Sequence, residues 1–125
     1  MLPKEVLDQK QKIKDFLKNL NIPIEKIKDD YLMIQSFVHK SFAADYKHIL
    51  DHNERLEFLG DGILSAITNK LLFIKYPEYP ESDLTLYKIA LVREETLAEV
   101  AKEINLDKYI FVSKWEERMQ WRKKN

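Results

Sequence analysis

The sequence predicts an all-α fold, and its composition and apolar periodicity are the two observations that support this. The 125 residues include only two glycines and four prolines, too few for the many tight turns of a β-sandwich or barrel. Apolar residues instead recur at helical spacing along much of the chain. With 45% hydrophobic and 34% charged residues, a chain of this length forms one domain with one core. We therefore expect one domain of about six helices over residues 1–125.

The first two helices are placed by apolar spacing and by turn-forming residues. The spacing predicts a helix over about residues 6–20, followed by an asparagine and a proline that terminate it. Asp29 or Asp30 is positioned to cap a second helix, which continues to about Phe42. Residues 43–52 are weakly patterned and predict a connection.

The longest periodic stretch predicts a central helix over about residues 53–76, stopped by Pro77 and Pro80. Its apolar side carries Leu56, Leu59, Ile63, Ile67, Leu71 and Ile74.

Two further helices are expected after these prolines. Ser82 or Asp83 is placed to cap the first of them. Thr96 followed by Glu99 forms a capping-box pattern. We therefore expect the helix to break or restart near residues 93–96.

Three carboxylates share one face of the central helix. Glu54, Glu57 and Asp61 stand at positions i, i+3 and i+7, which places them within a sector of about 60°. Like charges at this spacing repel each other, and hard oxygen ligands on a rigid element suit a divalent cation such as Mg²⁺. The alternative interpretation is a solvated acidic face.

Two neighbouring features favour a functional site. The only two glycines of the chain, Gly60 and Gly62, flank Asp61 and leave room for a substrate or another backbone, although an Asp-Gly turn that ends the helix is a rival explanation. Phe58 lies beside the acids, about 40° from Glu54 and away from the apolar side. We expect it to be covered by a neighbouring helix of the same chain or by a second subunit.

Four segments resemble the ribonuclease III family. Residues 53–61 (NERLEFLGD) are similar to its signature stretch, and residues 39–42 (HKSF) to its HKS[YF] segment. Residues 80–85 (PESDLT) resemble its acidic turn, and residues 90–98 (ALVREETLA) its helix junction. The resemblance covers about residues 31–112, in order and with similar spacing.

This resemblance implies an all-α endonuclease domain that forms a two-fold dimer and cuts double-stranded RNA with Mg²⁺, or with Mn²⁺ as a substitute, leaving 5′-phosphate and 3′-hydroxyl ends. By position, Glu57 would be a metal ligand and Asp61 a metal ligand that also orients the attacking water. Glu54 and Glu81 match two further acids near the cleavage site. Phe58 matches the aromatic residue that enters a pocket on the partner subunit.

One part of the family pattern is absent from these 125 residues. The resemblance implies further metal ligands from a later helix with an Asp-x-x-Glu-Ala pattern, but after Asp107 the only acids are the adjacent Glu116 and Glu117. Adjacent residues diverge by about 100° on a helix and cannot replace an i, i+3 pair. We therefore expect a C-terminally incomplete domain without a double-stranded-RNA-binding domain, with apolar surface on the central helix exposed or covered by another chain. The alternative function is a non-catalytic RNA-binding or RNA-processing partner, and a weaker one is a helical scaffold.

Other features limit the possible functions. The chain has no cysteine, and its 21 basic residues equal its 21 acidic ones, so a bulk basic field is excluded but a local basic strip is not. Residues 114–124 (KWEERMQWRKK) are rich in basic and aromatic residues and suggest either an RNA contact or a loose chain end. His39 is expected to cap the end of the second helix or to pack near the site. The longest apolar run is too short for a membrane span, and we expect a cytoplasmic protein.

Overall fold

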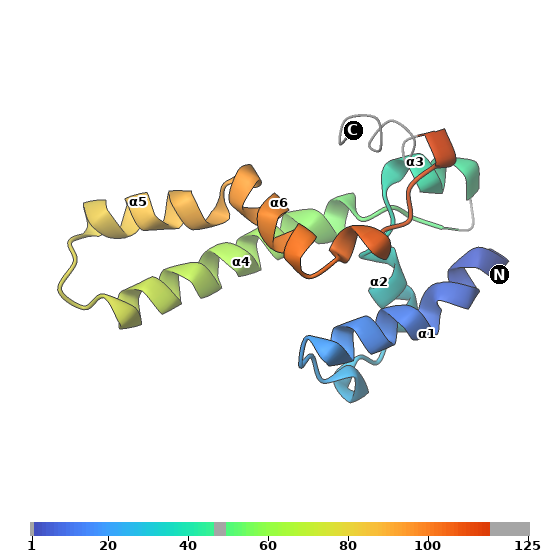
Figure 1. Cartoon of the computed structure of the whole chain (residues 1–125), viewed down its shortest axis with the longest axis horizontal. Helices are drawn as coiled ribbons and strands as arrows, with labels where there is room; N and C mark the ends of the chain where they lie inside the picture. Colours follow the sequence, from blue (N-terminus) through green and yellow to red (C-terminus); the bar gives the residue numbers. More distant parts are fainter. Residues whose placement is uncertain (1, 47–49, 116–125) are drawn as a thin grey trace. The chain divides into compact units, whose positions relative to one another are not determined.

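The computed structural model describes residues 2–46 and 50–115, and within them the chain is helical, as predicted (Figure 1). The α-helices are α1 (Lys4–Asn19), α2 (Asp30–Gln35), α3 (Lys40–Ala43), α4 (Glu54–Lys75), α5 (Glu81–Val92) and α6 (Glu94–Glu103). Short 3₁₀ turns are η1 (Ile24–Lys26), η2 (Ala44–Tyr46) and η3 (Leu106–Lys108). The described residues contain an isolated parallel bridge, between Val38 and Phe111, and no longer strand.

The chain divides into two compact units. The first, called here the core unit, comprises the residues up to Glu54 and those from Lys108 onward. The second, the α4–α6 unit, comprises Arg55–Asp107. Each unit is described by itself.

The core unit contains most of the buried apolar side chains. Phe16 on α1 stacks on Tyr109 with ring centroids 4.3 Å apart and meets Phe37 edge-on at 6.3 Å. Apolar residues at helical spacing on α1 thus face residues from both ends of the sequence. The buried apolar residues of this unit are Val6, Ile13, Phe16, Met33, Ile34, Phe37, Val38, Phe42, Ala43, Leu50 and Phe111.

The second predicted helix is shorter than expected. Asp29 caps α2 by accepting a hydrogen bond from the backbone N–H of Leu32 at 3.1 Å, as predicted, but α2 ends at Gln35 rather than near Phe42. The backbone of residues 37–39 instead pairs with Phe111, whose N–H donates to the Phe37 carbonyl at 2.8 Å and whose carbonyl accepts from His39 N at 2.9 Å. Because these backbone groups are used across the chain, they are not available to a continuous helix.

His39 caps the beginning of a helix, not the end of one, so that part of the prediction was wrong. Its Nδ1 accepts a hydrogen bond from the backbone N–H of Ser41 at 3.1 Å, at the N-terminus of α3. The Ser41 hydroxyl lies 2.7 Å from the same ring nitrogen and accepts a hydrogen bond from the backbone N–H of Ser113 at 3.0 Å. This small network satisfies a helix terminus and ties residue 113 to α3.

The α4–α6 unit begins with the predicted central helix. Helix α4 extends over Glu54–Lys75 without interruption, within a residue of the expected bounds. Helix α5 begins at Glu81, one to two residues before the predicted caps, and Pro80 occupies its N-cap position. Ser82 and Asp83 therefore lie inside the first turn, because the fixed φ of a proline already prepares the backbone for a helix start.

The break between α5 and α6 falls where it was expected, but its cause differs. Arg93 has an extended backbone with ψ of 155° and separates the two helices. Thr96 is not the N-cap: its hydroxyl donates to the Ala90 carbonyl at 2.6 Å and accepts from Arg93 Nε at 3.2 Å. The hydroxyl thus bonds back to α5 across the break, which replaces the predicted capping box.

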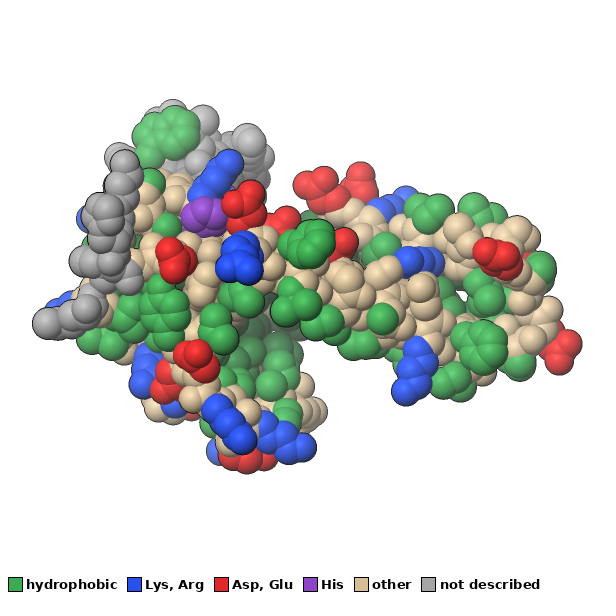
Figure 2. Space-filling model, turned by 180° about the vertical axis from the view of Figure 1, so that it is seen from behind, with side chains coloured by type: hydrophobic (Ala, Val, Ile, Leu, Met, Phe, Trp, Pro, Cys, Tyr) green, Lys and Arg blue, Asp and Glu red, His purple; other side chains and the backbone are tan. Residues whose placement is uncertain are grey.

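Little of the α4–α6 unit is buried. On α4 only Thr68 and Leu72 are buried among the described residues, and the predicted apolar side is exposed at five of its positions, Leu59, Ile63, Ile67, Leu71 and Ile74. Figure 2 shows hydrophobic side chains on the surface of this unit, at the right of the view. The expected apolar surface on the central helix is thus present in the single chain, and its coverage by another chain stays a prediction.

Candidate metal centre and subunit surface

The first turns of α4 position the three acids predicted to form a metal site. Glu54 begins the helix, and Glu57 and Asp61 follow on the same helix, one turn apart from each other. All three side chains are exposed. A regular helix therefore presents two neighbouring carboxylates, from Glu57 and Asp61, to solvent.

The two glycines lie within the helix and leave open space around Asp61. Helix α4 continues through Gly60 and Gly62, and neither has a positive φ. The Asp-Gly turn considered as a rival is therefore excluded. A Cβ placed on either glycine would meet nothing within 4 Å in the described part of the chain. The room beside Asp61 is thus open to a molecule from outside the chain.

The charge on Glu57 and Asp61 is not neutralised within the described residues. Neither carboxylate forms an ion pair there, whereas Glu54 lies 3.9 Å from His52 Nε2. Repulsion between two carboxylates one turn apart is relieved by a shared cation. Residues 2–46 and 50–115 bring together no group of three or more metal-binding side chains. The donor set therefore fits a Mg²⁺ ion that takes one or two carboxylates and completes its shell with water and phosphate oxygens.

Glu81 lies far from the Glu57 and Asp61 pair within one chain. It is the first residue of α5, which begins after the loop that follows Lys75 at the other end of α4 (Figure 1). The 18 residues between Glu57 and Lys75 correspond to about 27 Å of helix. Two of the four predicted acids, Glu57 and Asp61, are thus neighbours, Glu54 adjoins them on α4, and Glu81 is separate.

Phe58 is the most exposed aromatic side chain near the acids. Its side chain is 85% exposed although it is a large apolar residue. The described residues of its own chain therefore do not cover it, contrary to one of the two expectations. Burial of the ring by a second subunit stays a prediction.

Three tyrosines form a cluster that the sequence analysis did not identify as a site. Tyr76 follows α4, Tyr79 lies in the loop and Tyr87 lies on α5, with ring centroids 4.6–5.6 Å apart and interplanar angles of 15–29°. The signal available in the sequence was two tyrosines beside the two prolines of the loop, with a third tyrosine nearly two helical turns into the next helix. Tyr87 was instead interpreted as an ordinary helix residue.

The remaining predicted features have structural roles or lie outside the described residues. Lys10 and Lys14, expected on a solvated face, both contact Asp30 Oδ2, at 2.7 and 3.3 Å. Hydrogen bonding from Lys10 holds the pKa of the Asp30 carboxyl below its usual range. The basic and aromatic segment 114–124 lies outside the described residues beyond Trp115, which is exposed. In the described ranges, no helix has the length and apolar content to cross a bilayer.

Comparison with known proteins identifies relatives of this chain. A family model described as Ribonuclease-III-like matches residues 29–125. Ribonuclease 3 of Natranaerobius thermophilus is 44% identical over 89 residues, and that of Enterococcus faecalis is 46% identical over 90 residues. Each match covers 71% of this chain and 39% of the relative. The chain thus spans about 39% of the length of these curated relatives.

Solved structures agree with these matches. Two structures of the nuclease domain of ribonuclease III from Campylobacter jejuni superpose with TM-scores of 0.73 and 0.72 at 36% sequence identity. They cover 86% of this chain and 70% and 68% of the solved chains, and one of them describes flexibility in a region involved in dimer formation. The resemblance read from four sequence segments is therefore confirmed: the chain belongs to the Ribonuclease-III-like family.

Proposed function

We propose that this chain is an endonuclease domain that hydrolyses phosphodiester bonds of double-stranded RNA with Mg²⁺, or with Mn²⁺ in its place. The observation that carries the proposal is the pair of exposed carboxylates, Glu57 and Asp61, one turn apart on α4 with open space beside both glycines. Its relatives named Ribonuclease 3 support the reaction class. The products are 5′-phosphate and 3′-hydroxyl ends, and the domain works in RNA processing in the cytoplasm.

The residues of α4 have different roles in the proposed reaction. Glu57 and Asp61 hold the cation, and Asp61 also accepts a hydrogen bond from the attacking water, so that the water oxygen faces the phosphorus. When bound, Mg²⁺ neutralises phosphate charge and makes water a better nucleophile. The new P–O bond forms as the bond to the ribose 3′ oxygen breaks, and that oxygen takes a proton. The open space at Gly60 and Gly62 lets the RNA backbone approach Asp61.

The chain acts as a homodimer with Phe58 at the subunit interface. Burial of a phenyl ring that is 85% exposed in the single chain supplies a driving force for association. The dimer also accounts for Glu81. Since Glu81 lies at the far end of α4 from Glu57, it reaches the same phosphodiester only from a second copy, whereas Glu54 adjoins the pair on its own helix. Glu54 and Glu81 then act beside the scissile phosphate.

Two carboxylates hold Mg²⁺ weakly, because affinity rises with the number of anionic ligands that a site supplies. The Asp-x-x-Glu-Ala ligands implied by the family are absent from these 125 residues. With these two carboxylates alone, phosphate oxygens of the RNA and water would supply most of the shell. We expect metal affinity to rise when duplex RNA is present.

The test is incubation of an end-labelled RNA duplex with the chain and Mg²⁺. Glu57→Gln and Asp61→Asn should each lower cleavage by about 100-fold or more, because a lost ligand gives up several kcal/mol of charge stabilisation. Glu95→Gln, at an exposed position in the first turn of α6, is the matched control and should cleave as the unchanged chain does. Equal cleavage by all four proteins would overturn the proposed site.

A second function is favoured by one observation, that the described residues bring together no group of three or more side chains that could hold a metal ion. In that case the chain keeps the fold and the dimer but binds RNA without cutting it. The same assay separates the two functions. An intact duplex whose mobility shifts in a salt-sensitive way assigns the binding function. If the duplex is neither cleaved nor shifted in mobility, the remaining function is that of a helical scaffold.

A further inference from the structure

The imidazole of His52 lies against the first acid of the candidate site, at the point where α4 begins. Its Nδ1 accepts a hydrogen bond from the backbone N–H of Glu54 at 3.3 Å. Its Nε2 lies 3.9 Å from Oε2 of the Glu54 carboxylate. The side chain of His52 is 39% exposed, whereas that of Glu54 is 83% exposed. One ring thus faces both the backbone and the carboxylate of the same residue.

The backbone that carries His52 is held by α2 and by the residues that follow α2. The side-chain amide of Gln35 donates a hydrogen bond to the His52 carbonyl at 3.1 Å. The next residue, Asn53, donates from its backbone N–H to the Val38 carbonyl and from its side-chain amide to the Ser36 carbonyl, both at 3.0 Å. A side chain whose backbone is supported in this way keeps its geometry better than one on a mobile loop.

The hydrogen bond at Nδ1 also determines which ring nitrogen carries the proton. In a neutral imidazole one nitrogen accepts and the other donates. Because Nδ1 accepts from the Glu54 N–H, the proton of the neutral ring is on Nε2, the atom nearer the carboxylate. The 3.9 Å separation is longer than a hydrogen bond, but such contacts are commonly longer before substrate binds. The Glu54 side chain is exposed enough to turn toward that N–H.

We propose that His52 is a positioning residue of the nuclease site, which holds the Glu54 carboxylate through its Nε2–H. This inference rests on the proposed nuclease function, in which Glu54 acts beside the scissile phosphate. An exposed glutamate samples many rotamers, and a reaction that needs one of them must first restrict the side chain. The imidazole restricts the carboxylate before RNA binds. His52 itself does not contact the reacting atoms, and its effect passes through Glu54.

Two substitutions separate this role from a purely structural one. His52→Asn keeps an acceptor near the position of Nδ1 but removes the Nε2–H, whereas His52→Gln keeps an amide N–H near the position of Nε2. We expect His52→Asn to lower the single-turnover rate of duplex cleavage by about three- to tenfold, the cost of ordering one mobile side chain. Duplex affinity and the unfolding midpoint should not change. His52→Gln should retain most of the rate. The reverse order is expected of a ring that only caps α4, and it would overturn the proposal.

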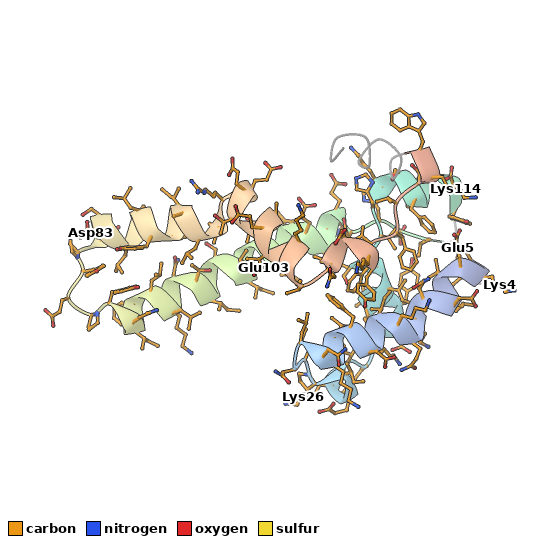
Figure 3. All side chains as sticks on the ribbon, viewed as in Figure 1. Lys4, Glu5, Lys26, Asp83, Glu103 and Lys114 are labelled. Atoms are coloured by element: carbon orange, nitrogen blue, oxygen red, sulfur yellow. The ribbon has the colours of Figure 1, made fainter. Side chains whose placement is uncertain are left out.

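A double-mutant cycle tests whether the effect passes through Glu54. In a Glu54→Ala background the partner carboxylate is gone, so His52→Asn should cause no further loss of rate. In a Glu103→Gln background His52→Asn should cause its full loss, because Glu103 is an exposed acid at the end of another helix, α6 (Figure 3). The same loss in both backgrounds would overturn the proposal.

Carbon-13 and nitrogen-15 NMR spectra give a readout that does not depend on cleavage. The side-chain carboxyl resonance of Glu54 should shift in His52→Asn, while those of Glu57 and Glu103 should not. The ring nitrogens of His52 should show the tautomer protonated at Nε2 when measured at alkaline pH. If the unchanged chain does not cleave the duplex, the nuclease function fails and these spectra alone decide whether His52 holds Glu54. An unshifted Glu54 carboxyl resonance, or a neutral ring protonated at Nδ1, would overturn the proposal.

Discussion

Replacing Phe58 by alanine tests the proposed dimer, and its effect can be worked out from the exposure of the ring. In the single chain 85% of the side chain is exposed, so nearly all of its burial would come from association. Complete burial of a phenylalanine contributes about 1.5–3 kcal/mol. A two-fold interface buries two such rings, which gives about 3–6 kcal/mol. At 1.4 kcal/mol for each factor of ten, the dimer should dissociate about 10²–10⁴ times more readily.

The assay is sedimentation equilibrium over a series of protein concentrations. The matched control is Ile74→Ala, because Ile74 is 63% exposed on the same helix and points about 160° away from Phe58. The control should leave the dissociation constant nearly unchanged. At concentrations low enough for the unchanged chain to be monomeric, both variants should unfold close to its midpoint, since exposed side chains contribute little to the stability of the monomer. A chain that remains monomeric at all concentrations, or equal weakening by both variants, would refute the reasoning.

Three further predictions concern stability and pH. Gly62→Ala should raise the free energy of unfolding by about 0.5–1 kcal/mol in urea titrations, because the helix is regular there and a methyl group meets open space. The same methyl group should lower duplex cleavage. A loss of stability would contradict a regular helix at this position. The hydrogen bond with Lys10 is the main cause of the lowered pKa of Asp30, so the ionised Asp30 carboxylate stabilises the folded state above pH 3.8 and this stabilisation should be lost as the pH falls through the lowered pKa. Lys10→Met should reduce this loss of unfolding free energy at acid pH. The same pH profile for the variant and the unchanged chain would exclude the ion pair. The hydrogen bond with Tyr87 raises the pKa of Tyr79 above 10, so the folded state should lose stability as the pH rises through that raised pKa. Ultraviolet titration should show late ionisation of Tyr79 and of Tyr46, whose pKa is raised by its hydrogen bond to Glu5, and Tyr87→Phe should shift only the Tyr79 titration to lower pH.

The sequence was sufficient to predict the features that depend on long local patterns. Helices α1 and α4 agree with their predicted bounds within about two residues, as expected when many periodic residues specify one face. The position of the break at Arg93 was also predicted, although from the capping-box pattern of Thr96 and Glu99, which is not its cause. The family could be recognised because four separate motifs occur in order, and Glu57 and Asp61 become neighbours through helical geometry alone.

Features that depend on contacts far apart in the sequence could not be predicted. The end of α2 at Gln35 results from backbone pairing with Phe111, and no local signal near residue 36 reports a partner 75 residues away. Thr96 bonds to the Ala90 carbonyl across the break, which its capping-box pattern concealed. The placement of Glu81 away from Glu57 follows from the return of the chain after Lys75, and periodicity does not report how consecutive helices turn back.

The cluster of three tyrosines was missed for a related reason. Periodicity assigns an aromatic residue on a helix to the core, and Tyr87 has the spacing of such a residue. Its exposure became clear only when Tyr76, Tyr79 and Tyr87 were found together beside Asp83. Two signals in the sequence separated this cluster from a core, the tyrosines beside the two prolines of the loop and the acidic composition of residues 76–87.

The most direct test of the proposed metal site is a Mn²⁺ titration of the chain followed by NMR, with duplex RNA present, because Mn²⁺ broadens the resonances of the groups that bind it. The carboxylate resonances of Glu57 and Asp61 should broaden first, and excess Mg²⁺ should restore them. Those of Glu95 and Glu103 should stay sharp until much higher Mn²⁺ concentrations. Equal broadening of all four carboxylates, or early broadening elsewhere while Glu57 and Asp61 remain sharp, would contradict a metal site on α4.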